Sequence, residues 1–169
     1  MNWKEKKVDF NDVLKEFYNN ISHEEKELYE KLSEKAIDLE YFPKKEKTKN
    51  LTISFSNRKT KKTLLKYSVN GKKIHNWRLK FYANKEYSKV FDQSIKEEIE
   101  RFNFKYVGCY GCGKCKKEKL GYNVIYEDGK KYFRCGFELI PVNAISDDIV
   151  KEAVKMMDIQ HLGFLKELE

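Results

Sequence analysis

The stretch TLLKYSVNGKKIHNWRLKF, residues 63–81, alternates apolar and polar side chains on both sides of an Asn-Gly pair. Alternation with a period of two predicts two β-strands that each bury one face, and Asn-Gly predicts the turn between them. A two-residue loop would place Leu65 opposite Asn76, on the face away from Trp77. A three-residue loop with a left-handed Gly71 brings both apolar sets to one face, so we predict the three-residue loop.

The chain on either side of this hairpin adds three more strands. Residues 51–56 alternate in the same way and predict a strand before the hairpin. Residues 122–140 predict a second hairpin around Asp128-Gly129, and a two-residue loop there places Tyr122 opposite Cys135 on one apolar face. The basic residues 44–50 are expected to form a linker.

Four segments have apolar residues at helical spacing. Two lie before the sheet, and the second begins with a Ser22–Glu25 capping box. A central helix is expected from an Asp92 cap to about Phe102, and a last one from a Ser146 cap to near Gly163. The fold class is therefore α+β: an antiparallel sheet of about five strands, an N-terminal helix pair, one central helix and a C-terminal helix.

The length of 169 residues is that of one domain, and 40% apolar residues suffice for a core. We expect residues 1–169 to form this domain, with 1–43 as a helical segment packed on it and 104–140 as a cysteine loop plus hairpin. The sequence contains neither a long apolar run nor a secretory signal, so we expect a cytoplasmic protein without a membrane span.

All four cysteines, Cys109, Cys112, Cys115 and Cys135, lie within 27 residues, and the first three recur at every third position. In a reducing compartment this clustering favours metal or redox chemistry over structural disulfides. Thiolates are good zinc ligands, and glycines at positions 111 and 113 suit a tight turn that offers amide N–H groups to sulfur. The sequence thus predicts a structural zinc site with these four cysteines as its ligands.

Other interpretations of the same cysteines remain open. Three closely spaced thiolates plus a remote one also suit an iron–sulfur cluster, and His75 or His161 could replace one zinc ligand. Cys112 or Cys115 could instead be a reactive thiol in a redox protein or an enzyme. Cys135 could simply be a small apolar core residue. We favour a binding protein over an enzyme, because no carboxylate pair and no Ser/His/Asp set stands out.

The formal net charge is +8, but only four of the 35 basic residues are arginine. Lysines concentrate in residues 41–75 and around the cysteines, so a nucleic-acid-binding module that stacks bases on Trp77, Tyr82 or Tyr110 is an alternative. The scarcity of arginine favours a solvated lysine surface instead. A small apolar ligand among Trp77, Phe81, Tyr122 and Tyr126, or a protein partner, is a further possibility that core packing explains equally well.

Three segments also carry a resemblance to a known family: WRLKFY at residues 77–82, QSIKEE at 93–98, and the helix over 150–161. Their order resembles that of small uncharacterised bacterial YdhG-like domains across residues 51–162. The resemblance implies a compact α+β fold and transfers no functional residue. The cysteine segment departs from that layout.

Overall fold

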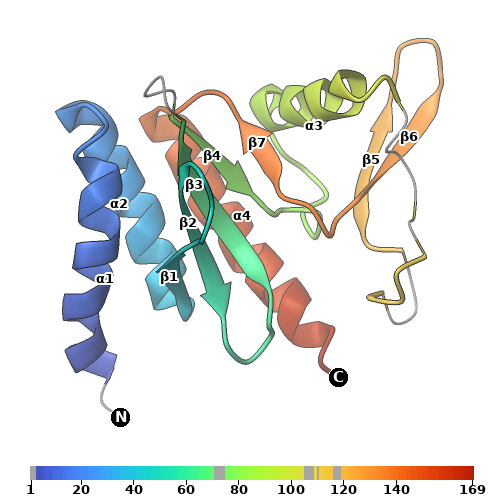
Figure 1. Cartoon of the computed structure of the whole chain (residues 1–169). Helices are drawn as coiled ribbons and strands as arrows, with labels where there is room; N and C mark the ends of the chain where they lie inside the picture. Colours follow the sequence, from blue (N-terminus) through green and yellow to red (C-terminus); the bar gives the residue numbers. More distant parts are fainter. Residues whose placement is uncertain (1–2, 71–74, 105–108, 110, 116–118) are drawn as a thin grey trace.

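The computed structural model describes residues 3–70, 75–104, 109, 111–115 and 119–169, with the side chains of residues 3–9 and 75 excepted. The predicted Gly71 turn, Tyr110 and the expected role of the His75 side chain lie outside the described residues. Four helices and seven strands follow in the order shown in Figure 1: α1 (Trp3–Tyr18), α2 (His23–Asp38), β1 (Tyr41–Lys45), β2 (Leu51–Asn57), β3 (Thr63–Val69), β4 (His75–Leu79), α3 (Lys89–Arg101), β5 (Gly121–Ile125), β6 (Lys131–Cys135), β7 (Ile140–Val142) and α4 (Asp147–Lys166).

The predicted fold class is confirmed. Five strands form an antiparallel sheet in the order β1-β2-β3-β4-β7, preceded by the helix pair α1 and α2 and followed by α4. Figure 1 shows α4 running behind this sheet, with α1 and α2 beside it near β1. Strand β1 was missed because Pro43 and the lysines that follow it suggest a linker; it is an edge strand, where proline is tolerated.

One face of the sheet is apolar and is covered by helices. Tyr67 lies at its centre, with its ring stacked on Phe17 of α1 at 4.7 Å between centroids and edge-on to Tyr29 of α2 at 5.0 Å. Phe55 and Trp77 pack on the same face and are also fully buried. This face holds most of the core.

The opposite face carries a row of mainly polar residues. Each residue in the row is directly paired with the next across the five strands: Lys44 with Ser54, Ser54 with Lys66, Lys66 with Arg78, and Arg78 with Pro141. Directly paired residues of an antiparallel sheet point to the same side. The row therefore brings a lysine and an arginine together at the middle of the sheet.

The register of the first hairpin differs from the prediction. Leu65 pairs with Leu79 and Tyr67 with Trp77, so the connection is longer than three residues. The apolar residues of both strands still share one face, as predicted. Alternation determines the face, and any even shift in pairing preserves it.

The second hairpin differs by one residue and is a separate sheet. Gly121, not Tyr122, pairs with Cys135, because the loop contains three residues and ends at Gly129 with φ of +79°. A three-residue loop with a left-handed glycine is a common hairpin connection. Tyr122 therefore faces the same side as Arg134, and Cys135 lies on the other side.

Two predicted helix caps are confirmed and two helix ends are corrected. The Ser22 capping box is present, and the Ser146 side chain accepts a hydrogen bond from the amide of Ile149. The central helix begins after Ser88, one turn before Asp92. Helix α4 continues through Gly163, where a Cβ would lie 2.9 Å from the Ala83 Cβ. That glycine permits close packing and does not end the helix.

Candidate functional site

The predicted turn geometry of the cysteine loop is present. Gly111 and Gly113 have φ values of +64° and +71°, and the amide of Gly111 donates to the Sγ of Cys109 at 3.4 Å. Cys109 and Cys112 are exposed, Cys115 is half-buried, and Cys135 is buried at the end of β6. All four line a cavity of about 290 Å³.

The predicted four-cysteine zinc site is nevertheless wrong. Among the described residues, which include all four cysteines, no three His, Cys, Asp or Glu side chains are grouped so that they could hold a metal ion. A zinc site requires each sulfur to lie about 2.3 Å from one point. Here the thiols surround a wide cavity, since two of them lie at the surface and Cys135 is buried. The iron–sulfur interpretation of these cysteines stays a prediction.

The aromatic residues proposed for ligand or base binding are occupied in other ways. Trp77 is buried, and its indole N–H donates to the Ala144 carbonyl at 3.0 Å. Phe81 packs edge-on to Tyr122 at 4.9 Å and donates its amide to the Tyr122 hydroxyl at 3.2 Å. The Tyr82 hydroxyl donates to Glu167. These rings are core or are held by hydrogen bonds, so they do not form a base-stacking platform.

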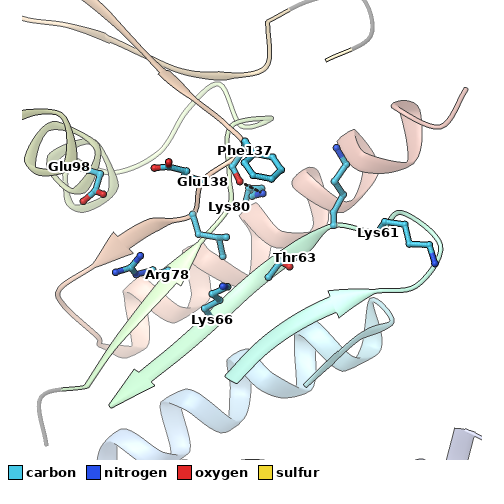
Figure 2. Close-up of a pocket in the computed structure, with 10 residues that line it drawn as sticks. Lys61, Thr63, Lys66, Arg78, Lys80, Glu98, Phe137 and Glu138 are labelled. Carbon is cyan, nitrogen blue, oxygen red and sulfur yellow. Dashed lines mark hydrogen bonds between the residues drawn. The ribbon is translucent and has the colours of Figure 1, made fainter. Parts of the chain in front are cut away.

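A different cavity, of about 350 Å³, lies on the polar face of the sheet (Figure 2). Its floor is formed by β3 and β4, and its roof by residues 137–139, which connect β6 to β7, together with α3. Basic residues outnumber acidic ones in its lining by five to two. The basic residues are Lys61, Lys62, Lys66, Arg78 and Lys80, and the acidic ones are Glu98 and Glu138.

Lys80 is the most buried of these basic residues, with 4% of its surface exposed. Its Nζ donates to the main-chain oxygen of Phe137 at 2.7 Å, the bond drawn as a dashed line in Figure 2. No carboxylate of the described residues forms an ion pair with it. Burial, and after it the charge of Lys62, lower the pKa of the Lys80 ammonium to about 8, while Glu167 acts in the opposite direction.

Arg78 lies in β4, two residues before Lys80, which directly follows the strand and continues its pairing with β3 through a hydrogen bond from its amide to the Leu64 carbonyl. Its Nε is buried and has no hydrogen-bond partner, and within the described part of the chain no carboxylate forms an ion pair with its guanidinium. An unsatisfied buried N–H is unfavourable by about 1–3 kcal/mol. Arg78 and Lys80 are thus two neighbouring cations without an anion.

The other two lysines near the middle of the cavity are paired. Lys62 contacts Glu167 at 2.5 Å, and Lys66 contacts Glu46 at 2.8 Å. Neither of these carboxylates belongs to the cavity lining. Lys61 is exposed and points away from the cavity in Figure 2.

The acidic side of the cavity is held by Arg134. This buried arginine forms an ion pair with Glu138 and lies 3.9 Å from Glu98, which also pairs with Arg101 at 3.2 Å. Both carboxylates therefore have arginine partners other than Arg78. The cavity has a neutralised acidic wall and a basic floor with two unpaired cations.

Comparison with family models, with curated proteins and with solved structures finds no match to this chain. The resemblance to YdhG-like domains stays a prediction, as does the cytoplasmic location. Within the described residues, no helix is both long enough and apolar enough to cross a bilayer.

Sequence reasoning overlooked this cavity because its residues match the pattern of a solvated strand face. Lys66, Arg78 and Lys80 alternate with core residues, as exposed charges normally do. The available signal was Arg78, one of only four arginines, placed at the centre of a strand. The burial of Lys80 depends on Phe137, which lies far along the chain.

Proposed function

We propose that this chain binds a small molecule through an anionic group, such as a phosphate or a carboxylate, in the cavity above β3 and β4. The observation that carries the proposal is the pair Arg78 and Lys80: two cations on one side of one strand, facing a cavity, without a described carboxylate partner.

Electrostatics supports an anion at this place. A buried cation without a counterion is unfavourable, and folded chains normally supply a partner, as they do here for Lys62 and Lys66. Arginine presents a planar fork that binds phosphate or carboxylate with two hydrogen bonds. An anion between Arg78 and Lys80 would satisfy the orphan Nε and neutralise both charges.

The size of the cavity limits the ligand. A volume of about 350 Å³ is near the lower end of the range for small-molecule sites. The ligand class that fits is a metabolite with one strongly acidic group and a short carbon skeleton. A polymer would need a longer basic groove than this cavity offers.

Titration with inorganic phosphate tests the proposal. Chemical-shift changes of the backbone amides of Lys66 and Lys80, which are present in the wild type and in every variant, report binding at this site when followed by NMR at constant ionic strength. We expect saturable binding to the wild-type chain and a loss of about tenfold to a hundredfold in Arg78→Gln, because a charge-assisted hydrogen bond contributes about 1.5–3 kcal/mol.

Lys155→Gln is the matched control, since it removes one exposed positive charge from α4, away from the cavity. Its phosphate affinity should equal that of the wild type. Absence of saturable binding to the wild-type chain, or equal losses in Arg78→Gln and Lys155→Gln, would overturn the proposal.

A further inference from the structure

We propose that Lys80 is also a nucleophile, which forms an imine with the carbonyl group of an aldehyde or ketone held in the cavity by its acidic group. This inference rests on the proposed function and identifies the ligand as an anionic carbonyl compound. It gives a role to a buried lysine that anion binding alone does not require.

The surroundings of Lys80 suit a neutral amine as well as an ammonium. Its single described hydrogen-bond partner is the carbonyl oxygen of Phe137 at 2.7 Å, which accepts from either form. The carboxylates that line the cavity, Glu98 and Glu138, are bound by Arg134. The amine is therefore held by a neutral group beside the cavity that Lys80 lines.

The protonation equilibrium favours the same role. With a pKa of about 8, roughly one Lys80 side chain in ten is neutral at pH 7, compared with about one in three thousand for an ordinary lysine at 10.5. Desolvated lysines with lowered pKa values are the usual amine nucleophiles of proteins.

The spacing of the two cations defines the ligand further. Arg78 and Lys80 are two residues apart on one side of a strand, so their Cα atoms are separated by about 7 Å. A ligand whose acidic group binds the guanidinium can place a carbonyl at the amine if a few bonds separate the two groups. Short aldehyde and keto acids and phosphorylated aldehydes meet this condition.

The chemical step balances without a co-reactant. The lone pair of the neutral Nζ attacks the carbonyl carbon, a C–N bond forms, and the carbonyl electron pair moves to oxygen. The oxygen then leaves as water with the two amine protons, and a C=N bond replaces the C=O bond. Neither an oxidant nor a reductant takes part.

Reductive trapping of the full chain tests the inference. The probe is succinic semialdehyde with sodium cyanoborohydride at pH 7.5, and peptide mass spectrometry compares the modification of Lys80 with that of the exposed Lys155. We expect Lys80 to react at least about tenfold faster. Butanal, a four-carbon aldehyde without the acidic group, should not show this preference, and inorganic phosphate should suppress the reaction with the semialdehyde.

Two variants separate the inference from the anion site. Lys80→Arg keeps the positive charge and should still bind phosphate while losing the trapped adduct; Arg78→Gln should reduce trapping. If the wild-type chain binds phosphate but Lys80 reacts no faster than Lys155, the nucleophile is overturned and the anion site stands. Equal reaction of Lys80 with both aldehydes would also overturn the inference, because the acidic group would then have no directing role.

Discussion

On the helix-covered face of the sheet, the buried hydroxyl of Tyr67 donates to the Tyr29 carbonyl at 3.0 Å and lies 2.9 Å from the Ser33 hydroxyl. On the polar face of the same hairpin, the described residues supply no partner for the buried Nε of Arg78, and they supply a carbonyl but no carboxylate for Lys80. The hydroxyl of Tyr67 and the Nε of Arg78 thus differ in whether the described residues supply a hydrogen-bond partner.

This contrast separates residues that stabilise the fold from residues that are retained for another reason. A hydrogen-bonded aromatic cluster lowers the free energy of the folded state, whereas unpaired buried cations raise it. Residues that reduce stability are typical of binding sites, where a ligand supplies the missing partner. This difference is the reason for proposing a ligand site on the polar face of the sheet.

The largest effect is expected on the helix-covered face. Tyr67→Ala should lower the free energy of unfolding by about 4 kcal/mol, because it removes a fully buried ring that contacts Phe17, Tyr29 and Phe55. Urea unfolding followed by circular dichroism measures the change.

Tyr67→Phe is the control and should lower the free energy of unfolding by only about 1 kcal/mol, since the ring remains and Ser33 keeps its bond to the Tyr29 carbonyl at 2.8 Å. A chain with Tyr67→Ala that unfolds at the same urea concentration as the wild type would show that this cluster is not the core of the fold.

On the polar face the expected change has the opposite sign. Lys80→Met should raise the free energy of unfolding at pH 7 by about 3 kcal/mol, because the shift of the Lys80 pKa from 10.5 to about 8 measures how unfavourable the buried charge is. Urea unfolding in chloride buffers, free of phosphate, measures the difference. A variant less stable than the wild type at pH 7 would contradict the contrast between the two faces.

The pH dependence provides a second measurement of the same group. Between pH 8 and 10 the unfolded chain binds more protons at Lys80 than the folded chain, so wild-type stability rises with pH in this window. Lys80→Met lacks this rise, and its advantage should shrink from about 3 kcal/mol at pH 7 to about 1 near pH 10. Above pH 10 stability should fall in both chains, because burial raises the pKa of tyrosines such as Tyr18, to about 12.

Alternation in the sequence was enough to predict the faces of the sheet but not the registers of its hairpins. Burial of one face requires Leu65 and Trp77 to lie on the same side, which any even shift of the register preserves, so the apolar pattern alone identifies the core. Loop length depends on the backbone conformation of a few residues. In the second hairpin the left-handed residue is Gly129, which ends a three-residue loop in place of the predicted two-residue loop. This difference of one residue places Cys135 on the opposite side from Tyr122.

The residues of the candidate sites were harder to predict. Whether the four cysteines meet, and whether Lys80 is buried, both depend on contacts between segments that are far apart in the chain. Cysteine spacing indicates which ligands are available, yet whether their sulfurs converge depends on how the loop meets the end of β6. Lys80 has the sequence pattern of a surface lysine, and it is buried where the Phe137–Leu139 connection crosses the sheet. Neither outcome is encoded in the local pattern.

The smallest expected effect concerns Glu46, which pairs with Lys66 at 2.8 Å at the margin of the polar face. Both side chains are about one quarter exposed, so Glu46→Gln should lower the free energy of unfolding by less than about 1 kcal/mol. It should also tighten phosphate binding several-fold in the NMR titration, since the Lys66 ammonium would no longer be neutralised, and added salt should reduce the gain.

Glu16→Gln, which breaks the exposed pair with Lys45, removes a carboxylate outside the cavity lining and should leave phosphate affinity unchanged. Weaker phosphate binding in Glu46→Gln than in Glu16→Gln would mean that Glu46 holds Lys66 in its binding position. The arrangement of side chains on the polar face would then depend on ion pairs, as that of the other face depends on its aromatic cluster.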